Sequence, residues 1–290
     1  MYYRRKILLS LLEMFGGKLE SIRLQKLLML LSKLQEKPSF DFVPYSHGCF
    51  SFQANADLKT LSKYKQLVRQ SETWEKIEEK SYFIELKQND KQALTDVKSE
   101  YQCMSSDQLT DVINEKYPYY TLNVKAFNPG NLDQIREKQM QLNKSKLFTI
   151  GYEGIFLETY LNKLIRNGVK SLLDVRRNSF SMKYGFSKSQ LKEACHEVNI
   201  KYYHLPELGI ESDKRKELKT QSDYDSLFEE YKKASLPNTL EVQRQIIDLI
   251  KQHQRVALTC FEADICQCHR KPLAESISEL SGSLYEVEHI

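Results

Sequence analysis

Thiol, imidazole, carboxylate and guanidinium groups lie close together near the end of the chain. Cys260 and Glu262 end an apolar run, RVALTCF, and Cys268, His269 and Arg270 follow shortly after. A cation or a helix N-terminus lowers a thiol pKa from about 8.5, which would make Cys260 a nucleophile. Glu262 would point to the same side of a strand and could orient or deprotonate that thiol. The alternatives are a buried apolar Cys260 and a Glu262 that only pairs with an arginine.

A metal site is the less favoured interpretation of the same residues. Cys260, Cys266, Cys268 and His269 would make four ligands, but their spacing lacks the two C-x2–4-C knuckles of structural zinc sites. Adjacent residues such as Cys268 and His269 can rarely both reach one ion. We therefore predict no metal, and expect His269 and Arg270 to begin a helix whose N-terminus attracts an anion.

Other polar residues follow apolar runs further upstream. Asp174 and Arg176 follow SLL, and His204 and Glu207 flank Leu205-Pro206. Asp174 is the strongest catalytic candidate, because a carboxylate that ends a buried strand in an α/β sheet commonly meets a ligand, a metal or a base. Asp174 could instead form an internal ion pair with Arg176. His204 and Glu207 resemble an acid–base pair, or else His204 bonds a backbone group and Glu207 pairs with Arg176.

The second half of the chain alternates expected strands and helices. Strands are predicted at 147–152, 171–176, 200–205, 255–261 and 283–290, and helices at 156–167, 187–198, 240–252 and 272–280. Repeated β-α-β units predict a Rossmann-like, mostly parallel sheet with helices on both faces. Such sheets bind ligands beyond the carboxyl ends of their strands, where Gly151 and Tyr152 would join the residues above.

The first half is predicted to be mainly helical. Helices are expected at 8–15, 23–34, 51–67, 94–100 and 106–115, with an aromatic β-like stretch at 40–50 and a strand at 81–86. This order fits a winged-helix-like module, as well as many unrelated helical ones. The turn signal at 128–131 and the polar segment after it place the domain boundary near residue 145, giving domains 1–145 and 146–290.

The charge of the chain is uneven along its length. The net charge is +4, but residues 1–146 hold 23 basic and 18 acidic side chains, and residues 147–290 hold 20 and 21. The excess in the first half is either a solvated helix face or a nucleic-acid contact surface. The predicted nucleic-acid-binding residues are Arg4, Arg5, Arg23, Lys26, Lys59, Lys63 and Lys65.

Composition and length fit an ordinary globular protein of about two domains, since 290 residues are 41% hydrophobic with few Gly and Pro. The six cysteines show no framework spacing, which favours a reducing, cytoplasmic setting. Glu13 interrupts the first apolar run, so we expect an amphipathic helix there rather than a signal peptide. No uncharged run approaches the ~20 residues of a membrane span.

Several motifs of the second half occur together in one known family. The segments TIGYEG, LLDVRRNSFS, FSKSQL, IKYYHLPELG and LTCFEADICQCHR, over about residues 147–275, strongly resemble the domain of unknown function 488 family. Tyr152-Glu153, Ile210 and Ile265 depart from the family's usual residues. The N-terminal segment looks like an extra region that a subset of the family carries. The resemblance supports the fold and the site rather than a reaction.

Three functions are compatible with these features. The first is a nucleic-acid-associated enzyme, such as a hydrolase in DNA repair or phage defence, that acts on DNA, another nucleic acid, a nucleotide or another anion. In it Asp174, Glu207, Cys260, Glu262 and His269 would be catalytic. Its binding residues would be Gly151, Tyr152, Arg176, His204, Cys268 and Arg270. The second is a non-catalytic ligand-sensing regulator that binds DNA or protein, and the third is a Cys260-dependent sulfurtransferase. GxGxxG and GxxxxGK[ST] are absent, so no cofactor is predicted, and the oligomeric state is left open.

Overall fold

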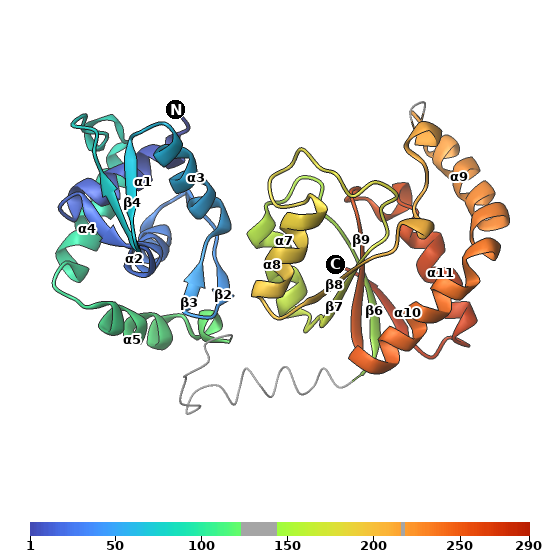
Figure 1. Cartoon of the computed structure of the whole chain (residues 1–290). Coiled ribbons are helices and arrows are strands. Elements are labelled where there is room, and N and C mark those ends of the chain that lie inside the picture. Colours follow the sequence, from blue (N-terminus) through green and yellow to red (C-terminus); the bar gives the residue numbers. More distant parts are fainter. Residues whose placement is uncertain (123–143, 216–217) are drawn as a thin grey trace. The chain divides into compact units, whose positions relative to one another are not determined.

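The computed structural model describes residues 1–122, 144–215 and 218–290. The chain divides into two compact units, Met1–Asp133 and Gln134–Ile290, which are described separately (Figure 1). The turn signal at 128–131 and most of the polar segment that follows it lie outside the described residues. The description resumes at residue 144, next to the boundary expected near residue 145.

Unit 1 combines helices with short antiparallel strands. Its elements are α1 (Tyr3–Met14), β1 (Lys18–Glu20), α2 (Ser21–Leu34), β2 (Val43–Tyr45), β3 (Gly48–Phe50), α3 (Phe52–Lys63), β4 (Leu67–Gln70), β5 (Thr73–Lys76), a 3-10 turn (Phe83–Glu85), α4 (Gln88–Tyr101), α5 (Ser106–Lys116) and a second 3-10 turn (Pro118–Thr121). One sheet has the order β1-β5-β4, and β2 and β3 form a hairpin. All of these pairs are antiparallel.

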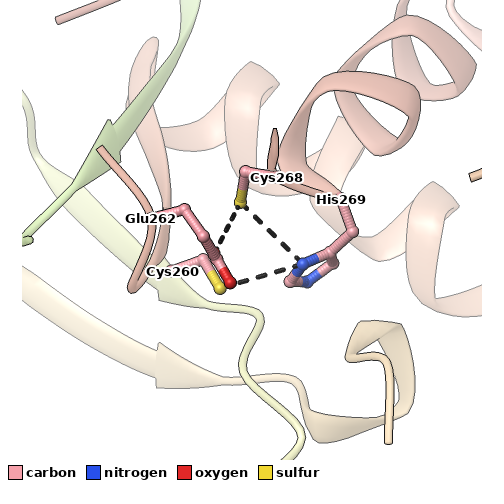
Figure 2. Close-up of side chains that lie close together, drawn as sticks. All are labelled: Cys260, Glu262, Cys268 and His269. Atoms are coloured by element: carbon pink, nitrogen blue, oxygen red, sulfur yellow. Dashed lines mark hydrogen bonds between the residues drawn. The ribbon is translucent and has the colours of Figure 1, made fainter. Parts of the chain in front are cut away.

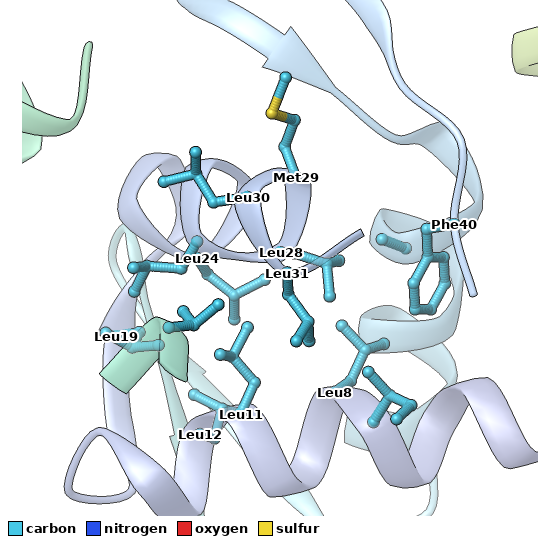
Figure 3. Close-up of a cluster of buried hydrophobic side chains, with 14 of the residues drawn as sticks. Leu8, Leu11, Leu12, Leu19, Leu24, Leu28, Met29, Leu30, Leu31 and Phe40 are labelled. Carbon is cyan, nitrogen blue, oxygen red and sulfur yellow. The ribbon is translucent and has the colours of Figure 1, made fainter. Parts of the chain in front are cut away.

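The core of unit 1 is built mainly from the leucines of α1 and α2. Leu8, Leu11 and Leu12 of α1 face Leu24, Leu28 and Leu31 of α2, and all six are fully or almost fully buried (Figure 3). The helical periodicity of both segments places these side chains on one face, and their burial removes a large apolar area from water. The predicted helices of this unit are therefore present.

The strands of unit 1 differ from the prediction. The segment 81–86, expected to be a strand, holds the 3-10 turn Phe83–Glu85. The carboxylate of Glu13 accepts hydrogen bonds from the backbone N–H groups of Tyr82 (2.9 Å) and Phe83 (3.3 Å), which fixes this turn against α1. The strands β1, β4 and β5 were not expected, because three or four residues are too few to show an alternating pattern.

Unit 2 is an α/β domain. Its strands are β6 (Lys146–Gly151), β7 (Ser171–Asp174), β8 (Lys201–His204), β9 (Arg255–Cys260) and β10 (Glu286–His289). Its helices are α7 (Leu157–Arg166), α8 (Lys188–Glu197), α9 (Gln221–Glu230), α10 (Leu240–His253) and α11 (Arg270–Leu280). Short helical turns lie at Pro206–Leu208, Ser212–Arg215, Tyr231–Ser235, Pro237–Thr239 and Ile265–Gln267. Helix α9 was not among the expected elements.

The five strands form one parallel sheet in the order β10-β6-β9-β7-β8. Every residue of β7 and β9 is buried, as expected for strands covered on both faces. Helices α7 and α8 lie on one side of the sheet, and α10 and α11 lie on the other (Figure 1). The predicted parallel α/β architecture with helices on both faces is confirmed.

The position of β9 in the sheet favours a site at its carboxyl end. The chain leaves β9 toward α11 on one face, whereas it leaves the neighbours β6 and β7 toward α7 and α8 on the other. Connections that diverge in this way open a crevice beyond the strand ends, where α/β proteins bind ligands.

Within the described ranges, no helix has both the length and the apolar character needed to cross a bilayer.

Candidate functional site

Several predicted site residues meet at one edge of the unit 2 sheet. The register pairs Gly151 with Cys260, and Asp174 with both Thr259 and His204, so the strands end almost level. Because all five strands are parallel, their carboxyl ends share this edge. We call it the carboxyl edge. The residues at it form two separate buried groups, one around Asp174 and one around Cys268.

Asp174 and Arg176 form a buried ion pair. The Arg176 Nε lies 2.8 Å from Asp174 Oδ1, and its Nη2 donates to Oδ2. Asp174 also accepts from the Arg176 backbone N–H at 3.1 Å and from the Tyr202 hydroxyl at 2.7 Å. The third nitrogen of the guanidinium, Nη1, donates to the Tyr152 hydroxyl (2.6 Å) and to the Phe186 carbonyl (2.9 Å). The pair thus connects β7 with β8, with the loop after β6 that contains Tyr152, and with the loop after β7 that contains Phe186.

This arrangement gives Asp174 and Arg176 a positioning part rather than a catalytic one. Asp174 is fully buried, and both of its oxygens already accept two hydrogen bonds. Burial alone would lower the pKa of Arg176, but the bonds and charge of Asp174 raise that pKa above its usual value. Burial and Asp174 also raise the pKa of Tyr202. The internal ion pair is the alternative that the geometry favours for these residues.

Tyr152 likewise belongs to the packed interior. Its side chain is buried, and its ring stacks on Phe186 at 4.3 Å and meets Phe261 edge-on at 5.4 Å. Gly151 serves close packing, because a Cβ added there would lie 1.9 Å from the backbone oxygen of Glu262. The two residues therefore shape the carboxyl edge from within the packed interior.

The second group contains Cys260, Glu262, Cys268 and His269. Their ligand atoms all lie within 4.8 Å of one another, and Figure 2 shows the four side chains turned toward a common point. His269 Nδ1 is 3.8 Å from Cys260 Sγ and 3.9 Å from Cys268 Sγ. Cys268 Sγ lies 3.1 Å from Glu262 Oε2. Hereafter these four residues are called the Cys-Glu-Cys-His cluster.

The start of α11 explains why Cys268 and His269 reach the same point. Cys268 is extended (φ −128°, ψ 134°), and His269 is already near helical values (φ −62°, ψ −11°). Adjacent side chains diverge in a regular strand, but this change of conformation turns both inward. Asp264 caps the turn before them by accepting from the backbone N–H of Cys266 at 2.8 Å, and Cys266 is exposed. Glu262 therefore occupies the place that the sequence reasoning gave to Cys266.

Arg270 is buried behind the cluster. Its Nε lies 3.0 Å from Cys268 Sγ, and its Nη2 donates to the backbone carbonyl of Glu262. Arg270 is 1% exposed, so it is a support for the cluster and does not reach solvent. The anion-gripping part that the sequence suggested for Arg176 and Arg270 is unsuited to two buried guanidinium groups.

The burial of the thiols bears on sulfur chemistry. Cys260 and Cys268 are 3% and 0% exposed. Burial, followed by the neighbouring Cys260, raises the pKa of the Cys268 thiol well above its ordinary value. A reactive thiolate is accessible and has a lowered pKa, so the geometry does not favour sulfur transfer through this pair. Glu262, which is partly exposed, is the member of the cluster nearest to solvent.

His204 and Glu207 do not form the expected acid–base pair with each other. The Nε2 of His204 donates to the Arg176 carbonyl at 3.0 Å, and its Nδ1 accepts from Lys188 Nζ at 3.0 Å. Glu207 is exposed and lines a cavity of about 210 Å³ together with Arg177 and Lys214. His204 is thus a backbone-bonding residue, as its alternative interpretation held. The pairing of Glu207 with Arg176 that the same interpretation expected is wrong, because the Arg176 guanidinium is engaged by Asp174.

Three of the predicted nucleic-acid-binding residues are engaged within unit 1. Arg4 and Arg5 both pair with Asp57 of α3, at 2.7 Å in the case of Arg5. Lys26 is 5% exposed and donates to the Ser106 carbonyl at 2.9 Å, and burial lowers the pKa of its ammonium group. Their sequence positions gave no sign of these partners, and Lys26 has no surface to offer a phosphate.

Three of the other four predicted basic residues are exposed. Lys59 and Lys63 are exposed on α3, and Lys65 is exposed just after it. Arg23 of α2 is half-buried and donates to the Gln102 carbonyl at 2.9 Å. Lys59, Lys63 and Lys65 are therefore the exposed members of the predicted set.

The sequence reasoning missed the apolar rim of the carboxyl edge. Exposed apolar side chains lie in the loops that follow β6, β7 and β9; they are Phe156 (62%), Phe180 (71%), Met182 (94%), Tyr184 (39%) and Phe261 (45%). The loop after β7 contacts the loop after β6, since Lys183 Nζ donates to the Tyr152 carbonyl at 2.7 Å. The alternation of basic and aromatic residues in RRNSFSMKYGF was the available signal.

Comparison with known proteins identifies one domain. Residues 156–277 match the family model described as "Domain of unknown function DUF488". The match includes the whole Cys-Glu-Cys-His cluster and leaves out β6, β10 and unit 1. No curated protein and no solved structure matches the chain. The resemblance seen in the sequence is thus supported for the greater part of unit 2.

Proposed function

We propose that unit 2 is a hydrolytic enzyme that processes a nucleic-acid strand or nucleotide at the carboxyl edge, and that unit 1 binds DNA. The apolar rim carries this proposal. Exposed aromatic side chains are unfavourable in water unless they meet a partner, and nucleobases stack on such rings in many single-strand-binding proteins. Arg177 and Lys183 on the same loop supply cations for the phosphates.

Glu262 is the residue that we assign to proton transfer. It is the partly exposed carboxylate at the carboxyl end of β9, between the rim and the buried cluster. A carboxylate in this position can accept a proton from a water molecule that attacks a phosphate ester. The P–O bond to the leaving group then breaks, and the leaving oxygen takes up a proton from solvent. The ion pair of Asp174 and Arg176 holds the surrounding loops, and Arg270 fixes the backbone of Glu262.

The first test compares the wild type with Glu262→Gln. Radiolabelled single-stranded DNA, duplex DNA, RNA and nucleoside triphosphates are the substrates offered. We expect the wild type to turn over one of them and Glu262→Gln to be at least about 100-fold slower, which is the usual contribution of general acid–base catalysis. The amide is nearly isosteric with the carboxylate, so the fold is retained.

Two further variants make this test specific. Glu193→Gln removes an exposed carboxylate of α8 and should leave the rate unchanged. Phe180→Ala should raise KM and leave kcat nearly unchanged, because it removes a stacking surface and not a reacting group. If the protein binds one of these substrates but turns over none of them, the enzyme hypothesis would be rejected in favour of the ligand-sensing regulator.

The connectivity of unit 1 supports the DNA-binding part of the proposal. Its order α1-β1-α2-α3-β4-β5, with the sheet order β1-β5-β4, is the connectivity of winged-helix domains, with the β2-β3 hairpin added between α2 and α3. The second helix of a helix-turn-helix pair enters the major groove, and α3 has that place here. Lys59, Lys63 and Lys65 would then contact phosphates at the end of α3.

This proposal predicts a defined change in salt dependence. Replacing Lys59, Lys63 and Lys65 together by alanine should weaken duplex binding and lower the slope of log K against log salt by about 0.9 per lysine. Fluorescence anisotropy of a labelled duplex across a salt series measures that slope. As the control, Lys37, Lys87 and Lys91 are replaced by alanine, which removes the same charge outside α3. Equal slopes for the two triple variants would exclude α3 as the contact.

A further inference from the structure

The Cys-Glu-Cys-His cluster has the composition and the compactness of a metal site. Two thiols, one imidazole and one carboxylate supply four ligand atoms, each from a residue type that binds zinc. An ion with tetrahedral bonds of about 2.0–2.3 Å holds its ligand atoms roughly 3.3–3.8 Å apart. Three of the separations in the cluster, 3.1, 3.8 and 3.9 Å, lie in or near that range, and all of them are within 4.8 Å.

The orientation of His269 is the second observation. Its Nε2 lies 3.1 Å from the carbonyl oxygen of Val175, and a carbonyl can only accept, so Nε2 carries the proton. The lone pair of Nδ1 is then directed at Cys260 Sγ and Cys268 Sγ. Histidine ligands of metals are oriented in this way, by donating their other N–H to a carbonyl or carboxylate. Val175 follows β7, so the neighbouring strand orients the ligand.

Charge gives the third observation. Arg270 is buried, and its Nε donates to Cys268 Sγ at 3.0 Å. A buried cation requires compensation by negative charge. A divalent ion with two thiolates, one carboxylate and one neutral imidazole has a net charge of −1, which the guanidinium of Arg270 balances. With the ion bound and both thiols ionised, as they are on a metal, the ion, its ligands and Arg270 are thus neutral together.

We propose that Cys260, Cys268, His269 and one carboxylate oxygen of Glu262 bind one zinc ion, which leaves the second oxygen of Glu262 for the proton transfer assigned to it above. Thiolate and imidazole ligands in a four-coordinate arrangement favour Zn²⁺ over Mg²⁺ or Ca²⁺, which prefer six or more oxygen ligands. The sequence argument against a metal assumed that Cys266 was a ligand and that neighbouring residues diverge. The capped turn before Cys268 removes both assumptions, because it leaves Cys266 in solvent and turns Cys268 and His269 inward.

Metal analysis of the full-length protein tests this proposal. The wild type, purified from a zinc-supplemented culture, should contain about one zinc per chain by mass spectrometry, as one four-ligand site requires. Cys268→Ser and Cys260→Ser should each lose most of that zinc. Cys266→Ser is the matched control, since it changes an exposed cysteine of the same loop, and it should retain the zinc. Equal loss in Cys266→Ser, or a zinc-free wild type, would overturn the proposal.

Two measurements on the wild type do not depend on how well the serine variants fold. Replacement of zinc by Co²⁺ should produce thiolate-to-cobalt charge-transfer absorption and the intense visible bands of tetrahedral cobalt. Alkylation of Cys260 and Cys268, followed by peptide mass spectrometry, should accelerate when a chelator is added, whereas Cys266 should react equally fast in both conditions. Absence of the cobalt bands, or an alkylation rate of Cys260 and Cys268 that does not change when the chelator is added, would argue against the site. Neither readout requires catalytic activity, so failure of the proposed function would leave the result unaffected.

Discussion

Replacement of Asp174 by alanine should lower the free energy of unfolding of unit 2 by about 3–5 kcal/mol, the usual cost of removing one partner of a buried ion pair. Arg176 is 5% exposed and would remain in the interior without its counter-charge. The Tyr202 hydroxyl, which donates to Asp174 at 2.7 Å, would lose its acceptor as well. Since domains are stable by only about 5–15 kcal/mol, this variant should be partly unfolded in mild denaturant. Urea unfolding followed by circular dichroism measures the loss.

Two companion variants separate charge from packing. Asp174→Leu combined with Arg176→Met removes both charges and should recover much of the lost stability, because a buried pair costs desolvation that an apolar pair avoids. Glu211→Gln breaks the exposed pair with Arg177, 4.0 Å apart, and should change stability by less than about 1 kcal/mol. Wild-type stability of Asp174→Ala would mean that the pair does not hold the loops. Loss of activity with unchanged stability would instead return Asp174 to the catalytic residues.

The architecture of unit 2 was predictable because its signals are long and consistent. Runs such as LFTIGY and RVALTCF are apolar throughout, which is typical of strands buried on both faces, and amphipathic helices separate them. The strands of unit 1 were not predictable in the same way. The three residues of β1 and the four of β4 and β5 are fixed by pairing with each other, which is tertiary information.

The sequence allowed the location of the candidate site at one edge of the sheet to be predicted, but not the role of each residue in it. Parallel strands end together, so Asp174, Cys260 and His204 had to lie at one edge once the β-α-β order was recognised. The depth of each residue below that edge depends on the loops. The bond between Val175 and His269 joins residues 94 positions apart in the chain. No spacing rule encodes such a contact, and the same holds for the pairing of Arg4 and Arg5 with Asp57.

Gly151→Ala should damage the carboxyl edge more than it damages the fold. An added Cβ would lie 1.9 Å from the Glu262 carbonyl oxygen and 2.6 Å from its carbonyl carbon, so the segment after β9 has to shift. Overpacking of this kind costs about 1–3 kcal/mol of stability. The same carbonyl accepts from Arg270, and the same residue carries the cluster's carboxylate. A displacement of about 1 Å at a reacting group can lower a rate by about 100-fold, and we expect a loss of that size in turnover. Zinc content should fall in the same variant.

The control for this variant is Gly282→Ala. Gly282 follows α11, has φ +66° and has open space around its Cα, so alanine there meets backbone strain but no clash. This strain should cost about 1–2 kcal/mol, comparable to the cost at Gly151, while zinc content and turnover stay at the wild-type level. Thermal unfolding and metal analysis of both variants decide the matter. If both lose stability and neither loses zinc or activity, the close approach of Gly151 to Glu262 has no part in the site. The opposite outcome, with site properties lost in Gly151→Ala alone, would show that the contact between β6 and the segment after β9 fixes the position of Glu262.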